Sequence, residues 1–214
     1  MRMLLNEQKE SNKMEMLTVV LVAMTVLVIA WSAYQATLWG GIQTFKLADA
    51  NAANRQATEL NLKQGQYSMI DSIMFMQYVN AHIDGNQERA DFYFERFRPD
   101  FKPAVQAWLD TDPFNDPGAP PHPFIMEEYQ RTFAEQAEQA AQTAKSKRDE
   151  AQQANQNSDN YVLYTVIYTA ILFIGSITTK FSSNRLNRIC LMIGAIALVA
   201  IVTSMFVFMP VATE

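Results

Sequence analysis

Residues 124–177 read FIMEEYQRTFAEQAEQAAQTAKSKRDEAQQANQNSDNYVLYTVIYTAILFIGSI, and this stretch decides the fold. No proline interrupts it, and its only glycine is Gly175. Small or apolar residues recur in steps of three, four or seven, at Tyr129, Phe133, Ala137, Ala140, Ala144, Ala151, Ala154, Ser158 and Tyr161. This spacing predicts one uninterrupted helix from Phe124 to Ile177. Because alanine buries little area, we expect the stripe to let a second helix approach closely.

The polar residues of this stretch stop after Asn160, and the following residues 161–179 are lipid-soluble. Two further apolar blocks, residues 16–39 and 189–211, contain no charged residue. About 20 apolar residues are needed to cross a bilayer, so all three blocks are long enough. The first block could also be a signal peptide, but it continues into Tyr34 and Trp39, which favours an uncleaved anchor. The sequence therefore predicts an all-α membrane protein with three transmembrane helices.

Residues 42–83 contain no proline and predict a second long helix. Its expected inner face consists of alanines and larger residues: Ala50, Ala53, Ala57, Leu60, Gln64, Tyr67, Ile70, Met74, Gln77 and Ala81. We expect helices 42–83 and 125–160 to pair as a long antiparallel hairpin of the coiled-coil kind outside the membrane. Gly40 and Gly41 could bend the chain where it leaves the first span.

Residues 84–124 join these two helices, and we expect them to form a compact cap. Asp84, Gly85 and Asn86 are typical of a helix end. Two short helices are predicted next, residues 87–97 and a second one opened by Pro99 and Pro103. They carry many large side chains, namely Phe92, Tyr93, Phe94, Phe97, Phe101, Val105, Trp108 and Leu109. Burying them would fix the register of the alanine-lined hairpin.

Lysine and arginine are concentrated in two short segments, which predicts the orientation. Residues 1–15 carry Arg2, Lys9 and Lys13, and the loop 180–188 carries Lys180, Arg185 and Arg188. We therefore expect both segments in the cytoplasm, with residues 40–160 and the tail 212–214 on the other side. Residues 35–160 hold eleven basic and eighteen acidic residues, which argues against a nucleic-acid partner.

Four stretches carry a resemblance: WSAYQATLWGGIQTFKLADANAANR, RFRPDFKPAVQAWL, DPGAPPHPF and ANQNSDNYVLYTV. They resemble a set of uncharacterised bacterial inner-membrane proteins of similar length. The resemblance runs from the first span to the second, and it implies the three-span topology and a bacterial inner-membrane location. It implies no activity and no functional residue.

Candidate metal ligands are few. His82 and His122 could meet in the cap, and Met74 precedes His82 on the same helix, a combination that would suit Cu(I). No His or Cys pair has the spacing of a metal site, so we expect no metal and no cofactor. The sequence also contains no phosphate-binding or nucleophile fingerprint, and the single Cys190 has no evident base partner. We expect the protein not to be an enzyme.

The three spans contain no Asp, Glu, Lys, Arg or His. Thr18, Thr25 and Ser32, spaced by seven, could hydrogen-bond to a neighbouring helix or line a pore. The alanines exceed what one hairpin needs, and we expect hairpin or oligomer packing at Ala53, Ala57, Ala140, Ala144 and Ala151. The leading hypothesis is a homo-oligomeric scaffold or accessory subunit that assembles with itself or with another membrane complex. The alternatives are a homo-oligomeric channel lined by the first span and a sensor that signals through a partner.

Overall fold

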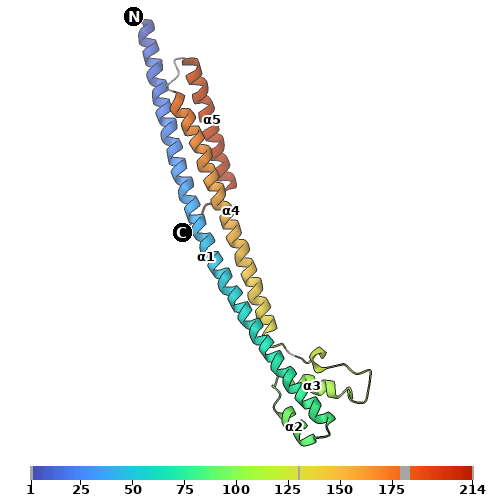
Figure 1. Ribbon diagram of the computed structural model, residues 1–214. Helices are drawn as coiled ribbons and strands as arrows, with labels where there is room; N and C mark the ends of the chain where they lie inside the picture. The colour runs from blue at the N-terminus through green and yellow to red at the C-terminus, as the bar shows by residue number, and fades with distance from the viewer. Residues whose placement is uncertain (1, 130, 179–183, 214) are drawn as a thin grey trace. The chain divides into compact units, whose positions relative to one another are not determined.

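A computed structural model gives the backbone of residues 2–129, 131–178 and 184–213, and the side chains of these residues except 2–11 and 184. Five α-helices and one 3₁₀ helix follow one another in the described ranges, and these ranges contain no strand (Figure 1). They are α1 (Arg2–Ile83), α2 (Gln87–Glu95), α3 (Lys102–Leu109), η1 (Pro123–Ile125), α4 (Ala134–Thr178) and α5 (Asn184–Phe208). The predicted all-α class is confirmed. Helices α1, α4 and α5 are long and apolar enough to cross a membrane, which is consistent with a multi-pass membrane protein.

Helix α1 runs unbroken through Gly40 and Gly41. A helical glycine keeps its backbone hydrogen bonds and costs only about 1 kcal/mol relative to alanine, so it does not have to break a helix. At this point α4 comes close: the hydroxyl of Ser158 lies 3.9 Å from the position that a Cβ of Gly40 would take. The same hydroxyl donates a hydrogen bond of 2.9 Å to the carbonyl of Ala36.

The end of α1 confirms the predicted stop at residues 84–86. Gly85 adopts φ +70°, and its N–H donates to the carbonyl of His82, while the N–H of Asn86 donates to Ala81. This pair of bonds closes the carbonyl end of a helix, and the left-handed residue it requires favours glycine. Asn86 then caps α2, because its side chain accepts a hydrogen bond from the N–H of Arg89.

The predicted start of the long helix at Phe124 is wrong, since α4 begins only at Ala134. Phe124 lies in η1, and both Phe124 and Tyr129 pack against the aromatic core described below. The N–H of Phe133 donates to the side-chain carbonyl of Gln64 at 3.0 Å, which satisfies a donor at the helix start. Burial of large rings has overridden a helical spacing that was only a local preference.

Two other predicted boundaries also shift. Helix α2 ends at Glu95, and Phe97 follows it outside the helix. Helix α5 begins at Asn184 and ends at Phe208, so the last residues of the predicted third span, 209–211, are not helical. Pro210 cannot continue the hydrogen-bond ladder of a helix. Much of the predicted cytoplasmic loop, residues 180–183, and the terminal Glu214 lie outside the described residues.

The chain forms two compact units. The bundle unit comprises Met1–Ala48 and Lys147–Glu214, and the aromatic unit comprises Asp49–Ser146. In the bundle unit α1, α4 and α5 lie side by side (Figure 1). Contacts pair Leu21 with Gly194 and Ser32 with Met205, so α5 runs parallel to α1, while α4 runs antiparallel to both. The buried core of this bundle is mostly aliphatic and tyrosine side chains: Leu21, Ala36, Tyr161, Tyr168, Ile171, Leu191, Leu198 and Met205.

The aromatic unit has a core of rings between α1, α2, α3 and η1. Phe101 is fully buried, and rings of four residues lie within 5.2–6.4 Å of its centroid: Phe75, Phe97, Phe124 and Tyr129. The inner face of α1 here differs from the predicted one, because Ile70 and Gln77 are exposed while Asp71 and Tyr78 are buried. The buried positions Ala50, Ala57, Asp71 and Tyr78 follow a seven-residue repeat. Asp71 was left off the predicted inner face because its side chain is charged.

Candidate functional site

The row of hydroxyls predicted in the first span faces the interior of the bundle. Thr18, Thr25 and Ser32 are all buried. Thr18 donates to the carbonyl of Met14 and Thr25 to that of Leu21, whereas the Ser32 hydroxyl donates to the sulfur of Met205 at 3.3 Å. This face of α1 is therefore occupied by helices of the same chain, and it is not available to line a pore between chains.

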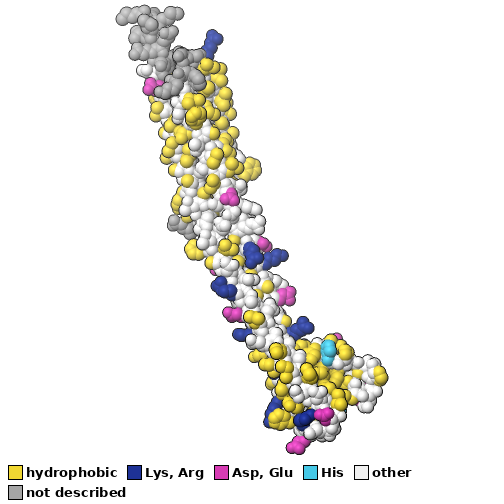
Figure 2. All heavy atoms as spheres, viewed as in Figure 1, with side chains coloured by type: hydrophobic (Ala, Val, Ile, Leu, Met, Phe, Trp, Pro, Cys, Tyr) yellow, Lys and Arg dark blue, Asp and Glu magenta, His cyan; other side chains and the backbone are white. Residues whose placement is uncertain are grey.

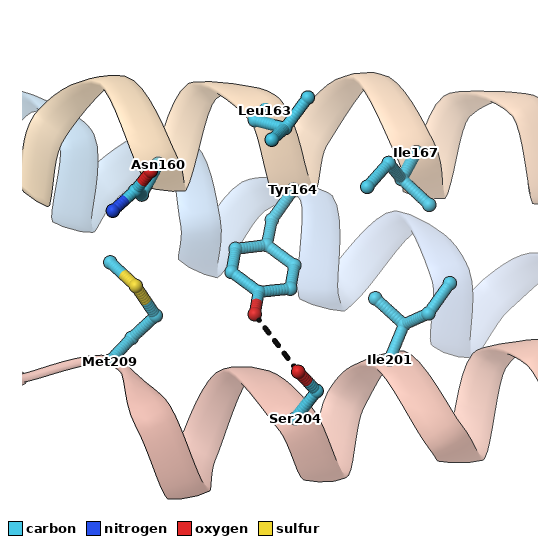
Figure 3. A pocket seen from close by; sticks show the side chains of 7 residues that line it. All are labelled: Asn160, Leu163, Tyr164, Ile167, Ile201, Ser204 and Met209. Atoms are coloured by element: carbon cyan, nitrogen blue, oxygen red, sulfur yellow. Dashed lines mark hydrogen bonds between the residues drawn. The ribbon is translucent and has the colours of Figure 1, made fainter.

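A pocket of about 350 Å³ opens between α4 and α5 (Figure 3). Leu163, Ile167 and Ile201 form its aliphatic walls, and Asn160 and Met209 lie at one end. Inside it the hydroxyls of Tyr164 and Ser204 are 3.1 Å apart and share a hydrogen bond. The lining offers aliphatic contact and two kinds of polar group, an amide and hydroxyls, but no pair of acid and base. It could hold a small amphipathic molecule.

A second groove, of about 340 Å³, lies between α1 and α5 in the bundle and is lined by aliphatic and methionine side chains. Its residues are Leu17, Val20, Leu21, Met24, Leu191, Met192, Ala195, Leu198 and Val199. Next to it, Leu21 packs against two glycines. Its Cδ2 lies 3.2 Å from the position that a Cβ would take at Gly194 and 3.6 Å from that position at Gly175. Such close approach at small residues is how helices associate in lipid.

The residues that follow α5 are held by polar contacts to α1 and α4. The side chain of Gln35, fully buried, accepts from the N–H of Ala212 at 2.8 Å and donates to its carbonyl at 3.4 Å. The carbonyl of Pro210 accepts from the indole of Trp39 and from the hydroxyl of Tyr161, both at 3.1 Å. The buried amide of Gln35 and the buried hydroxyl of Tyr161 are thereby paired in places where an unpaired polar group would be costly.

The most elaborate polar cluster lies in the aromatic unit around Asp71 of α1. Arg98 donates to both carboxylate oxygens of Asp71, at 3.0 and 2.8 Å, and to Asp100 at 3.1 Å. The hydroxyl of Tyr129 lies 3.1 Å from Ser68 and 3.4 Å from Asp71. The Asp71 side chain is 1% exposed and that of Arg98 19%. A bidentate arginine–carboxylate pair of this geometry fixes the orientation of the segments that it joins.

Arg98 and Tyr129 keep their charge states around neutral pH. The hydrogen bond from Arg98 to Asp71 raises the pKa of the guanidinium above its ordinary value, so Arg98 remains a cation. Burial raises the pKa of the Tyr129 phenol, which remains neutral and can donate. The cluster joins α1, the α2–α3 connection and the segment before α4, and its donors and acceptors are used for this purpose.

The candidate metal ligands His82, Met74 and His122 each lie against aromatic side chains. Among the described residues no group of three or more His, Cys, Asp and Glu side chains could hold a metal ion. His82 is stacked on the ring of Phe114 at 4.1 Å, and Met74 packs against the aromatic core. His122 lies beside Phe124, and its Nδ1 is buried without a hydrogen-bond partner.

The alanines selected from the sequence face a neighbouring helix of the same chain. Ala57, Ala140, Ala144 and Ala151 are buried, and Ala53 is half-buried. Ala53 and Ala140 line a shallow polar groove of about 270 Å³ together with Gln56, Gln136, Gln139 and Thr143. Four of these five alanines are therefore enclosed within one chain, whereas Ala53 stays partly exposed beside the groove.

Sequence reasoning missed the two best-built polar contacts. Asp71 occupies a position of the seven-residue repeat that is otherwise buried, and a carboxylate in such a place needs a cation. Gln35 lies in the first span, which is described above only as uncharged. A buried amide there also needs hydrogen-bond partners. Neither partner, Arg98 or Ala212, could be selected from spacing, because 27 and 177 residues separate the pairs.

Comparison with protein-family models, with curated proteins and with solved structures found no match.

Proposed function

We propose that the protein is a non-enzymatic, oligomeric integral membrane protein that acts as a scaffold or accessory subunit. In this proposal the bundle unit anchors the chain in a bacterial inner membrane. The aromatic unit belongs to an extracytoplasmic helical hairpin with an aromatic cap, and it carries the binding surface. The amino terminus and the loop before α5 lie in the cytoplasm, because Lys13, Arg185 and Arg188 border the spans there.

One observation carries the proposal: α1 exposes large apolar side chains within the aromatic unit, well beyond its apolar span. Leu62, Met69, Ile73, Met76 and Ile83 are between 47% and 70% exposed. In water, scattered apolar side chains are ordinary, but a row of them along one helix marks a surface that a partner covers. Over the face visible in Figure 2 the most continuous hydrophobic cover lies on the helices of the bundle unit, as expected for a surface in lipid.

The polar side chains of the aromatic unit support the same proposal. Asp71, Arg98, Tyr129 and Gln64 all bind groups of their own chain and fix its segments in place. Side chains used in this way hold a shape, and a rigid helical surface is what a scaffold presents to its partner.

Oligomer mass tests the proposal. The full chain, purified in lipid nanodiscs or mild detergent, should give a particle whose protein mass is a multiple of 24.3 kDa. A particle that contains a single chain would contradict the oligomeric scaffold.

Topology is tested separately. Reporter fusions after Gly118 and after Ser183 should report opposite compartments, with Gly118 outside the cytoplasm. If Ser183 maps to the exterior, the proposed orientation is inverted.

A further inference from the structure

Five of the six large apolar side chains that α1 exposes in the aromatic unit follow a repeat, and the sixth, Ile70, lies next to Met69 of that repeat. Taken with the polar residues between them, the five fall at alternating steps of four and three along the outward seam: Leu62, Gln66, Met69, Ile73, Met76, Asn80 and Ile83. All seven are exposed. Alternating steps of this kind are the heptad pattern by which one helix packs along another.

The outward seam lies on the side of α1 that is turned away from its own chain. Met69 and Met76 each precede a buried residue, Asp71 or Tyr78, by two positions. At about 100° per residue, two positions correspond to about 200° around the helix. A second helix can therefore pack on the outward seam without displacing α4 or the aromatic core.

The residue types of the outward seam specify a helix as its partner. Leu62, Met69, Met76 and Ile83 take the d positions of the heptad, and Ile73 takes a central a position between Gln66 and Asn80. Amide side chains at a positions cost stability, and they fix the register and the number of strands. Two facing amides each offer a donor and an acceptor, so identical residues can satisfy one another.

We propose that the outward seam pairs with the outward seam of a second copy of this chain, parallel and in register. The inference rests on the proposed oligomeric function and names the surface that would produce it. Two copies anchored in one membrane run their α1 helices in the same direction, and parallel pairing sets Gln66 opposite Gln66 and Asn80 opposite Asn80. The seam is complementary to itself in this arrangement.

Charge fits this occupant better than a lipid surface. From Leu62 to Ile83 the only charged residues are Lys63 and Asp71, and Asp71 is buried against Arg98. Lys63 takes an e position, and the g position that it would face in a parallel pair is the uncharged Thr58 of the preceding heptad. Like charges therefore do not oppose each other, whereas a helix that binds anionic lipid would need several basic residues.

Cysteine cross-linking in the full-length protein tests the pairing. In a Cys190→Ser background, Met69→Cys and Met76→Cys should each give a disulfide-linked dimer under mild oxidation, because d positions of a parallel pair face each other. Asn61→Cys, exposed on the same helix but about 80° away from Met69, is the matched control and should not cross-link. Equal cross-linking at Asn61 and Met69, or disulfides formed with a different protein in intact membranes, would overturn the inference.

Charge insertion separates this inference from the proposed function. Ile73→Lys should weaken association about tenfold or more, while Asn61→Lys should leave the particle mass unchanged. Helical circular dichroism should be the same in both variants, since both positions are exposed. If the wild type is an oligomer and Ile73→Lys remains the same oligomer, the outward seam is not the interface, although the scaffold proposal stands. If the wild type itself is a single chain, both fail.

Discussion

In the bundle unit, Cδ2 of Leu21 lies 3.2 Å from the Cβ position of Gly194, and Ser32 donates a hydrogen bond to Met205. In the aromatic unit, Phe101 is enclosed by four rings, and Asp71 is held by a bidentate arginine. In the first unit, close approach at glycine and hydroxyl hydrogen bonds add to an aliphatic and tyrosine core, whereas large rings and an ion pair form the core of the second.

The difference follows from the surroundings that each unit is proposed to occupy. Lipid chains are as apolar as leucine, so apolar burial does not drive helices together in a membrane, and close backbone approach and hydrogen bonds have to do so. In water the burial of rings is itself strongly favourable, at about 1.5–3 kcal/mol for a large side chain. The two units should therefore respond differently to substitution.

The largest effect is expected for Phe101→Ala in the aromatic unit. Removing a fully buried phenylalanine leaves a cavity among the rings and should destabilise the unit by about 3–5 kcal/mol. Hydrogen exchange of peptides from residues 49–146 measures the loss locally. Phe92→Ala is the control, because Phe92 is half exposed and lies outside the buried core. Similar protection of wild type and Phe101→Ala would show that the rings do not hold this unit.

Asp71→Ala should have the next largest effect. It removes the bidentate partner of the largely buried Arg98 guanidinium and leaves only Asp100. We expect this to cost about 3 kcal/mol, the lower end for a broken buried pair, because Arg98 is partly exposed and keeps one acceptor. Asp100 is the other acceptor of Arg98, and the Asp100 side chain is 42% exposed. Asp100→Ala should therefore cost only about 0–1 kcal/mol. Chemical denaturation that ranks Asp100→Ala as the more harmful change would contradict the buried pair.

In the bundle unit we expect Gly194→Leu to act by overpacking. The new side chain meets Leu21, and forcing the two helices apart should cost about 1–3 kcal/mol. Ala200→Leu adds a similar volume at an exposed position of the same helix and should be nearly neutral. The measurement is thermal aggregation of the purified full chain in detergent. An equal midpoint for both variants would mean that α1 and α5 do not need close approach.

The smallest effect concerns Glu150, which binds Lys46 at 2.6 Å and Lys147 at 3.0 Å. These hydrogen bonds lower the pKa of Glu150 below its ordinary value of 4.5. A lowered carboxylate pKa stabilises the folded state at pH values above the ordinary value, and this contribution is lost as the pH falls through the lowered one. Glu150→Gln should therefore be slightly less stable than wild type at neutral pH, and the two should become equally stable once the pH falls below the lowered pKa. A difference that grows in acid would reverse this assignment.

The sequence contained enough to predict the helical class, the three apolar helices and the stop at Gly85, because each depends on composition or on a local backbone requirement. It did not predict the start of α4 at Ala134. Phe124 and Tyr129 fit a helical period, and only the aromatic core, built from residues distant in sequence, shows why they leave the helix.

The candidate site shows the same limit. The seven-residue spacing of Thr18, Thr25 and Ser32 was visible in the sequence, but whether they faced a pore or a neighbouring helix depended on where α4 and α5 lie. Ile70 was placed on the inner face of α1 because it is apolar, and Asp71 was passed over because it is charged. The reverse is observed, since Arg98 supplies the partner that makes a buried carboxylate tolerable.

The bundle unit consists of two stretches of chain, and the whole aromatic unit lies between them in the sequence. Its contacts have very different lengths: Arg98 and Asp71 are 27 residues apart, whereas Ser32 and Met205 are 173 apart. During synthesis Arg98 therefore emerges early enough to bind Asp71 while α5 does not yet exist. Contacts close in sequence also form faster, because less chain has to be ordered to close them. The aromatic unit can therefore be folded before α5, the helix that Ser32 contacts, has been synthesised.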